Sequence, residues 1–243
     1  MVNFKKRMNR PYIILHMISS VNGKILTEPW RHTRAWENVK DTFDEMYKSF
    51  ETDGWICGRV TMEKDFSDET PQLITPDFEI SGDYYVGDET AKSFAVAVDP
   101  SGKIGWTKNE IDGDHIIEIL SNKVSNEYLY YLQRRKISYI ISGKDSVDLV
   151  SAFQRLSELF PIKSLLLQGG GYLNGSMLNL GLVDELNILV LPITDLNEGP
   201  TSLELGNYRK LNMVNDLTLV SADAKKNGEV HLRYKTLNSK TIR

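Results

Sequence analysis

Three consecutive glycines follow a short apolar run and precede a helix-type pattern in residues 165–178. Glycine lets backbone N–H groups approach an anion without a Cβ in the way, and a helix that begins there adds unpaired donors and the positive end of its dipole. We therefore predict that this turn binds the phosphates of a nucleotide, although a turn that binds nothing fits the run equally well. The predicted cofactor-binding residues are Gly169, Gly170, Gly171, Tyr172, Leu173 and Asn174.

A second strand-to-helix junction lies at Gly58. Arg59 offers a forked guanidinium group to a phosphate, and Thr61 offers a hydroxyl group beside the first amides of the helix. One nucleotide with two separated phosphate groups suits two such turns, and a 2′-phosphate on the adenosine ribose calls for an arginine of this kind. The two turns together favour NADPH over NADH as the cofactor. A helix start with a surface arginine is the alternative reading of this motif.

Titratable groups that suit reductive chemistry are few. Hydride transfer needs an electrophilic carbon close to the nicotinamide, exclusion of water and a proton source. His16, at the end of a predicted first strand, titrates near neutral pH and is the candidate acid; a buried histidine with a structural hydrogen bond is the alternative. Asp65 is either a second candidate or a solvated surface carboxylate. Neither the histidines nor the single Cys57 shows metal-ligand spacing, so we predict no metal.

Composition limits the possible partners. The 243 residues carry a formal net charge of −4, whereas a dedicated nucleic-acid binder needs a basic face. No apolar run approaches the ~20 residues that cross a bilayer. We therefore expect a cytoplasmic protein that acts on a small molecule and binds neither nucleic acid nor membranes.

Hydrophobic periodicity predicts the elements that position these residues. Strand-type runs occupy residues 12–18, 55–57, 94–98, 116–119, 139–142, 164–167 and 185–191, and helix-type runs occupy residues 36–50, 59–64, 126–135, 147–160 and 171–180. Residues 217–222 and 230–237 flank a turn and predict an antiparallel hairpin. The polar residues 67–89 predict a long loop or lid. One α/β domain over residues 1–243 accounts for the whole pattern.

The two best-known nucleotide motifs are absent. A dinucleotide fold would carry Gly-x-Gly-x-x-Gly on its first strand-to-helix turn, but here the glycines come late and Asn174 stands where the last glycine belongs. No Gly-Lys-Ser or Gly-Lys-Thr follows a glycine loop, which excludes a Walker motif.

Residues 11–25, 58–61 and 168–186 resemble the riboflavin-biosynthesis pyrimidine reductase family, in the same order along the chain. The Gly-Leu-Val-Asp-Glu-Leu stretch at residues 181–186 is the most specific part of the match. The resemblance implies a dihydrofolate-reductase-like α/β fold, with a mostly parallel central sheet, flanking helices and an antiparallel C-terminal hairpin. It also implies NADPH as hydride donor, a phosphoribosylamino-pyrimidine as substrate and a homodimer.

By position, the resemblance assigns phosphate binding to residues 169–174 and the adenosine end to Arg59 and Thr61. Asp65 matches an aspartate that binds the substrate in the family. Trp30 corresponds to an aromatic residue near the nicotinamide. Catalytic roles are predicted for His16, Asn22 and Asp65, and substrate contacts for Ser19, Trp30 and Gln168.

Three positions depart from the family pattern: His16 replaces a frequent Lys, Asn22 an Asp, and Gln168 a Glu. Asn22 cannot accept a proton as Asp does, and Gln168 offers a donor where Glu offers only acceptors. The changes at Asn22 and Gln168 favour an alternative, a reductase of dihydrofolate or another small heterocycle. A nucleotide-binding protein that kept the cofactor turns but lost catalysis is a further alternative.

Overall fold

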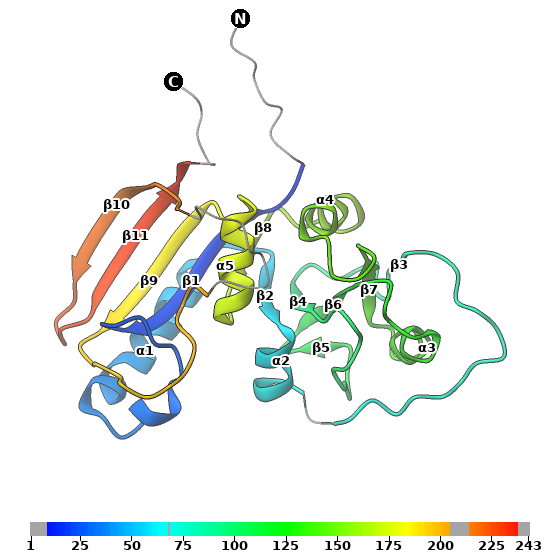
Figure 1. Cartoon of the computed structure of the whole chain (residues 1–243), viewed down its shortest axis with the longest axis horizontal. Helices are drawn as coiled ribbons and strands as arrows, with labels where there is room; N and C mark the ends of the chain where they lie inside the picture. Colours follow the sequence, from blue (N-terminus) through cyan, green and yellow to red (C-terminus); the bar gives the residue numbers. More distant parts are fainter. Residues whose placement is uncertain (1–8, 68, 205–213, 238–243) are drawn as a thin grey trace, which may run out of the picture.

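The computed structural model describes residues 9–67, 69–204 and 214–237. Asp68, within the predicted loop, is not described. For Asn38, Lys40 and Asp41 only the backbone is described. The described strands form a single eleven-stranded sheet with the order β10-β11-β9-β1-β8-β2-β4-β6-β7-β3, and β5 pairs with β6 (Figure 1).

The elements follow one another along the chain as strand and helix in near alternation. The strands are β1 (Tyr12–Ser20), β2 (Gly54–Gly58), β3 (Tyr84–Tyr85), β4 (Phe94–Val98), β5 (Glu110–Ile111), β6 (Asp114–Leu120), β7 (Ser138–Ile141), β8 (Ser164–Leu167), β9 (Glu185–Leu191), β10 (Leu217–Ala224) and β11 (Val230–Thr236). The helices are η1 (Glu28–Trp30), α1 (Arg34–Ser49), α2 (Arg59–Asp65), α3 (Asn126–Arg134), α4 (Leu149–Leu159) and α5 (Gly171–Asn179).

Parallel pairing at the centre of the sheet brings the predicted turns to one edge. β1 lies between β8 and β9, and β8 also pairs with β2, all in parallel. Parallel neighbours end at the same edge, so the junctions after β8 and β2 lie side by side. The C-terminal strands β10 and β11 continue the sheet from β9 in antiparallel pairing. This arrangement confirms the predicted fold class.

Helices cover both faces of the sheet, which the strand sequences require because their side chains alternate between two apolar environments. On one face α4 and α5 bury side chains such as Phe153 and Met177 against Ile13 and Leu15 of β1. On the other face the packing involves α1, α2 and α3. Full burial of a side chain such as Phe153 stabilises the fold by roughly 1.5–3 kcal/mol.

Capping side chains determine where two helices begin, and hydrophobic periodicity alone predicted these starts two residues away. Helix α1 begins at Arg34, earlier than predicted, because the Thr33 side chain accepts a hydrogen bond from the Trp36 N–H at 3.2 Å. Helix α4 begins at Leu149, later than predicted, because Asp148 caps it through the Ser151 N–H at 3.1 Å. The short elements η1, β3 and β5 were not predicted, since two or three residues show no period.

None of the described helices has the length and apolar character that a membrane crossing would require.

Candidate functional site

The glycine turn after β8 is fastened to the end of β2. Past Leu167, the Gln168 N–H still donates to the Ile56 carbonyl at 2.9 Å, and the Gly58 N–H donates to the Gly169 carbonyl at 2.8 Å. Gly169 has a φ of +105°, a backbone conformation that side-chain-bearing residues rarely adopt. The two junctions singled out in the sequence are therefore one connected structure.

Helix α5 begins directly at this turn, with Gly170 as its N-cap and no side chain capping it. The N–H groups of Leu173 and Asn174 donate to the Gly170 carbonyl. Within the described residues, the N–H groups of Gly171 and Tyr172 have no acceptor. Unpaired amides at a helix start favour an anion, because they donate hydrogen bonds and carry the positive end of the helix dipole.

Thr61 of α2 is the neighbour of this helix start. A Cβ built on Gly170 would lie 3.7 Å from the Thr61 Oγ1, which is ordinary contact distance. The Thr61 hydroxyl therefore lies next to the turn and adds a donor to the unpaired amides. Tyr172 is 63% exposed, as expected for a residue at the mouth of such a site.

Two further glycines of the motif, Gly171 and Gly175, allow the backbone of a neighbouring segment to pack closely against α5. A Cβ on Gly171 would approach the Thr201 carbonyl to 2.1 Å, and one on Gly175 would approach the Glu204 carbonyl to 1.9 Å. The segment of residues 192–204, which we call the return segment, runs directly against α5 here. The Glu204 N–H donates to the Gly171 carbonyl at 3.0 Å.

Leu173 and Asn174 also face the protein. Leu173 belongs to the core, and Asn174 is fully buried with its Nδ2 donating to the Ser202 carbonyl at 2.8 Å. Their backbone donors are used inside α5, so among the six predicted residues the N–H groups of Gly169, Gly170, Gly171 and Tyr172 have no acceptor within the described residues.

Asn22 ties the turn after β1 to the same return segment. Its Oδ1 accepts from the Ser20 hydroxyl at 2.9 Å and from the Asp195 N–H at 3.0 Å, and its Nδ2 donates to the Asp195 carbonyl at 2.7 Å. A side chain with both an acceptor and a donor satisfies both backbone groups of Asp195, which a carboxylate does not. Asn22 therefore positions this loop.

The His16 side chain is on the face of β1 that packs against α1, opposite to the face where Met17 lies next to Gly169. It is fully buried and stacks on Phe43 of α1, with ring centroids 4.3 Å apart and an interplanar angle of 9°. Neither ring nitrogen has a hydrogen-bond partner within the described chain. Burial, reinforced by His231, lowers the pKa of His16 to about 4. His16 is therefore buried and neutral near pH 7, which argues against its predicted role as the catalytic acid.

Trp30, predicted to contact substrate, is also a core residue. It is 1% exposed, packs near Val39 and Leu189, and donates from its indole Nε1 to the Asp195 Oδ2 at 2.7 Å. The Trp30 ring therefore packs on the α1 side of the sheet.

The remaining predicted residues lie at strand ends or on α2. Ser19 is buried near the end of β1, and Gln168 is half-buried at the end of β8. Asp65 is exposed and follows Thr61 by four residues on α2, which places both on one helix face. Thr61, Asp65, Gln168 and the glycine turn thus share one side of the strand ends.

Arg59 occupies a different face of α2 from Thr61, since two residues correspond to about 200° of helix. Its Nη1 pairs with the Glu63 Oε2 at 2.5 Å, and its charge lies close enough to the buried Asp99 to favour the ionised form of that carboxyl. Burial nevertheless raises the pKa of Asp99 overall. The basic group predicted for an adenosine phosphate is therefore paired with the Glu63 carboxylate.

A buried polar cluster around Glu118 was not predicted from the sequence. Glu118 of β6 is fully buried, and its Oε1 accepts from the Trp106 indole at 2.5 Å and from the Tyr128 hydroxyl at 2.8 Å. Burial, together with the charge of Asp99, raises the pKa of Glu118 well above its ordinary value. The feature of the sequence that could have indicated this cluster is a glutamate inside the apolar run of residues 116–120.

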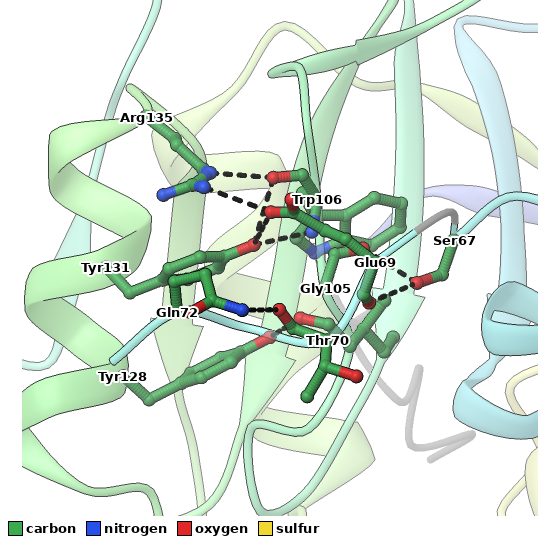
Figure 2. A network of polar contacts seen from close by, with 10 residues as sticks. Ser67, Glu69, Thr70, Gln72, Gly105, Trp106, Tyr128, Tyr131 and Arg135 are labelled. Carbon is green, nitrogen blue, oxygen red and sulfur yellow. Dashed lines mark hydrogen bonds and ion pairs between the residues drawn. The ribbon is translucent and has the colours of Figure 1, made fainter. Parts of the chain in front are cut away.

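A cavity of about 500 Å³ opens beside Glu63, between α2 and the segment that begins the long loop. Figure 2 shows how that segment is fastened: the Ser67 hydroxyl donates to the Gly105 carbonyl at 2.8 Å, and Arg135 pairs with Glu69 at 3.0 Å. Lys103 also lines the cavity. The start of the predicted lid is therefore anchored over residues 103–106.

No group of three or more potential metal-binding side chains occurs in the part of the chain that the structure describes.

The strand order, the helices on both faces and the antiparallel C-terminal strands define an α/β protein with the dihydrofolate-reductase-like fold. The chain belongs to the RibD C-terminal domain family, whose model matches residues 11–228. This membership confirms the resemblance seen in the sequence motifs.

Named relatives are distant. The chain is 26% identical over 191 residues to the 2,5-diamino-6-ribosylamino-4(3H)-pyrimidinone 5′-phosphate reductase of Methanothermobacter thermautotrophicus, covering 76% of this chain and 79% of the relative. The enzyme of the same name from Archaeoglobus fulgidus is 23% identical over 185 residues, covering 76% and 81%.

Solved structures show the same fold. A pyrimidine reductase-like protein from Corynebacterium diphtheriae superimposes with a TM-score of 0.63 at 17% identity, covering 94% of this chain and 92% of that one. The riboflavin biosynthesis reductase of Saccharomyces cerevisiae gives a TM-score of 0.59 at 16% identity, covering 96% and 92%.

Proposed function

We propose that the protein is an NADPH-dependent reductase that acts on a phosphoribosylamino-pyrimidine of riboflavin biosynthesis. The observation that carries the proposal is the start of α5, where the unpaired N–H groups of Gly171 and Tyr172 lie beside the Thr61 hydroxyl. Family membership and the names of the archaeal relatives support the choice of chemistry.

In the proposal, the chain holds the coenzyme at two places. The amides of Gly171 and Tyr172 and the hydroxyl of Thr61 bind the pyrophosphate, and Arg59 binds the 2′-phosphate of the adenosine ribose. The bound coenzyme supplies a hydride for the ribose C1′ of the substrate. The residues present fit this group, because open amides, a hydroxyl and a guanidinium surround neighbouring strand ends.

In the proposal, the substrate contacts the side of α2 that faces the glycine turn. Asp65, one helical turn beyond Thr61 and exposed, accepts hydrogen bonds from sugar hydroxyls, while the Gln168 side chain approaches from the end of β8. Asn22 acts at a distance, since it fixes the loop that closes over the end of β1.

A spectrophotometric assay of NADPH oxidation tests the proposal. Purified protein is mixed with NADPH and, in parallel, with 2,5-diamino-6-ribosylamino-4(3H)-pyrimidinone 5′-phosphate, with 5-amino-6-(5-phosphoribosylamino)uracil or with dihydrofolate. We expect oxidation with one of the two ribosylated pyrimidines. Oxidation with dihydrofolate alone would favour a reductase of another heterocycle, and coenzyme binding without turnover would favour a nucleotide-binding protein.

A homodimer is part of the same proposal. Strand β10 pairs with β11 on one side and with no other described strand, and it exposes Leu217, Leu219 and Val220. An edge strand with exposed apolar side chains favours association with a second copy. Light scattering of the purified protein, with a mass of twice 27.7 kDa expected, tests this point.

A further inference from the structure

The one arginine offered to the adenosine phosphate already has an anionic partner. Arg59 and Glu63, four residues apart on α2, form an ion pair of 2.5 Å, and their side chains are 34% and 35% exposed. The i, i+4 spacing places both groups on the same face of the helix, so a ligand that reaches Arg59 also meets Glu63.

We infer that Glu63 competes with the coenzyme's 2′-phosphate for Arg59 and thereby limits the preference for NADPH over NADH. The inference rests on the proposed function, since it takes the nicotinamide coenzyme as the ligand of this face. It assigns to Glu63 the control of coenzyme specificity, a role that the sequence motifs did not suggest.

Charge explains why the two coenzymes respond differently. A phosphate monoester carries about −1.5 to −2 charges near neutral pH, and it must either displace the Glu63 carboxylate or lie beside it. The buried Asp99 nearby adds to the unfavourable field whenever it is ionised. The 2′-hydroxyl of NADH carries no charge, and it therefore neither repels Glu63 nor competes for Arg59.

The structure also offers the Glu63 side chain a second position. Its side chain lines the cavity of about 500 Å³, and Lys103 lines the same cavity. A Glu63 side chain released from Arg59 turns into this space, toward a second cation. The competition is thus an exchange of partners and requires no movement of α2.

Glu63→Gln tests the inference, because it removes the charge and keeps the size of the side chain. Isothermal titration calorimetry measures the Kd values of NADPH and NADH, and those of the fragments 2′,5′-ADP and 5′-AMP. We expect Glu63→Gln to bind NADPH and 2′,5′-ADP roughly three- to tenfold more tightly, and to change the Kd of NADH and 5′-AMP less than twofold. The gain shrinks at high salt, since both groups are partly exposed.

Two matched variants separate this effect from general ones. Glu158→Gln makes the same change of net charge on the exposed side of α4 and leaves all four Kd values unchanged. In an Arg59→Ala background, where the contested cation is gone, Glu63→Gln produces no gain in NADPH affinity.

The outcomes distinguish the two proposals. If neither coenzyme nor fragment binds the wild-type protein, the proposed function is wrong and the inference falls with it. If NADPH binds but Glu63→Gln changes NADPH and NADH equally, or weakens NADPH, the competition is refuted while the proposed function stands.

Discussion

Replacing His16 by leucine is expected to remove much of the protein's sensitivity to mild acid. The imidazole is fully buried against Phe43 with both nitrogens unpartnered within the described chain, and burial lowers its pKa from the ordinary 6.5 to about 4. Leucine has a similar volume and carries no group that protonation would charge.

The size of the effect follows from linkage. Between pH 6.5 and 4 the unfolded chain binds a proton at His16 that the folded chain does not, so the free energy of unfolding falls as the pH falls. At ~1.36 kcal/mol for each pKa unit, the loss reaches about 3 kcal/mol at pH 4. The contribution is fully present above pH 6.5.

Urea unfolding of the wild type and His16→Leu at several pH values between 4 and 7.5 measures this difference. The variant is expected to lose about 3 kcal/mol less than the wild type over that range, and to keep its activity at neutral pH. His32→Gln, at an exposed position, serves as the control and behaves as the wild type. Parallel losses in wild type and His16→Leu would refute the reasoning, and loss of turnover in the variant would restore His16 as a catalytic candidate.

Three further predictions address the site and the buried carboxyl. Gly170→Val keeps the fold, because Gly170 has an ordinary φ of −69° and no atom closer than 3.7 Å to its Cβ position, but it blocks the amides of α5 and abolishes calorimetric binding of both coenzymes; unchanged affinity would show that the turn binds no phosphate. Asp65→Asn raises the KM for the pyrimidine substrate about tenfold and leaves the Kd of NADPH unchanged; an altered coenzyme Kd would contradict a substrate role. Glu118→Gln raises the melting temperature at pH 8 but not at pH 4, because the raised pKa of Glu118 opposes ionisation only above its ordinary range; a lower melting temperature at pH 8 would contradict this.

The sequence predicted the fold well because strand and helix periods are local properties. The run at residues 164–167 and the glycines after it gave β8 and the start of α5 nearly as they stand. Helix starts were less accurate, since they depend on single capping side chains such as Thr33 and Asp148. Elements of two or three residues carry no period and could not be predicted.

Candidate site residues were harder to judge because their roles depend on which face of an element they occupy. His16 and Trp30 have suitable side chains near the end of β1, yet both point toward α1 and are buried. Asn22, assigned to catalysis, links two loops through the backbone of Asp195. The i, i+4 spacing of Arg59 and Glu63 allows an ion pair, but only the structure shows that the pair forms, and the proposed competition with a ligand rests on that pair.

In the proposed binding mode, helix α2 divides recognition of a dinucleotide into two independent parts. Thr61 faces the glycine turn, whereas Arg59 and Glu63 face the cavity on the other side. The proposal therefore expects substitutions on the cavity side to change which coenzyme is accepted, while binding of the pyrophosphate stays intact. For protein engineering, this seven-residue helix is a natural place to exchange one nicotinamide coenzyme for the other without rebuilding the pocket.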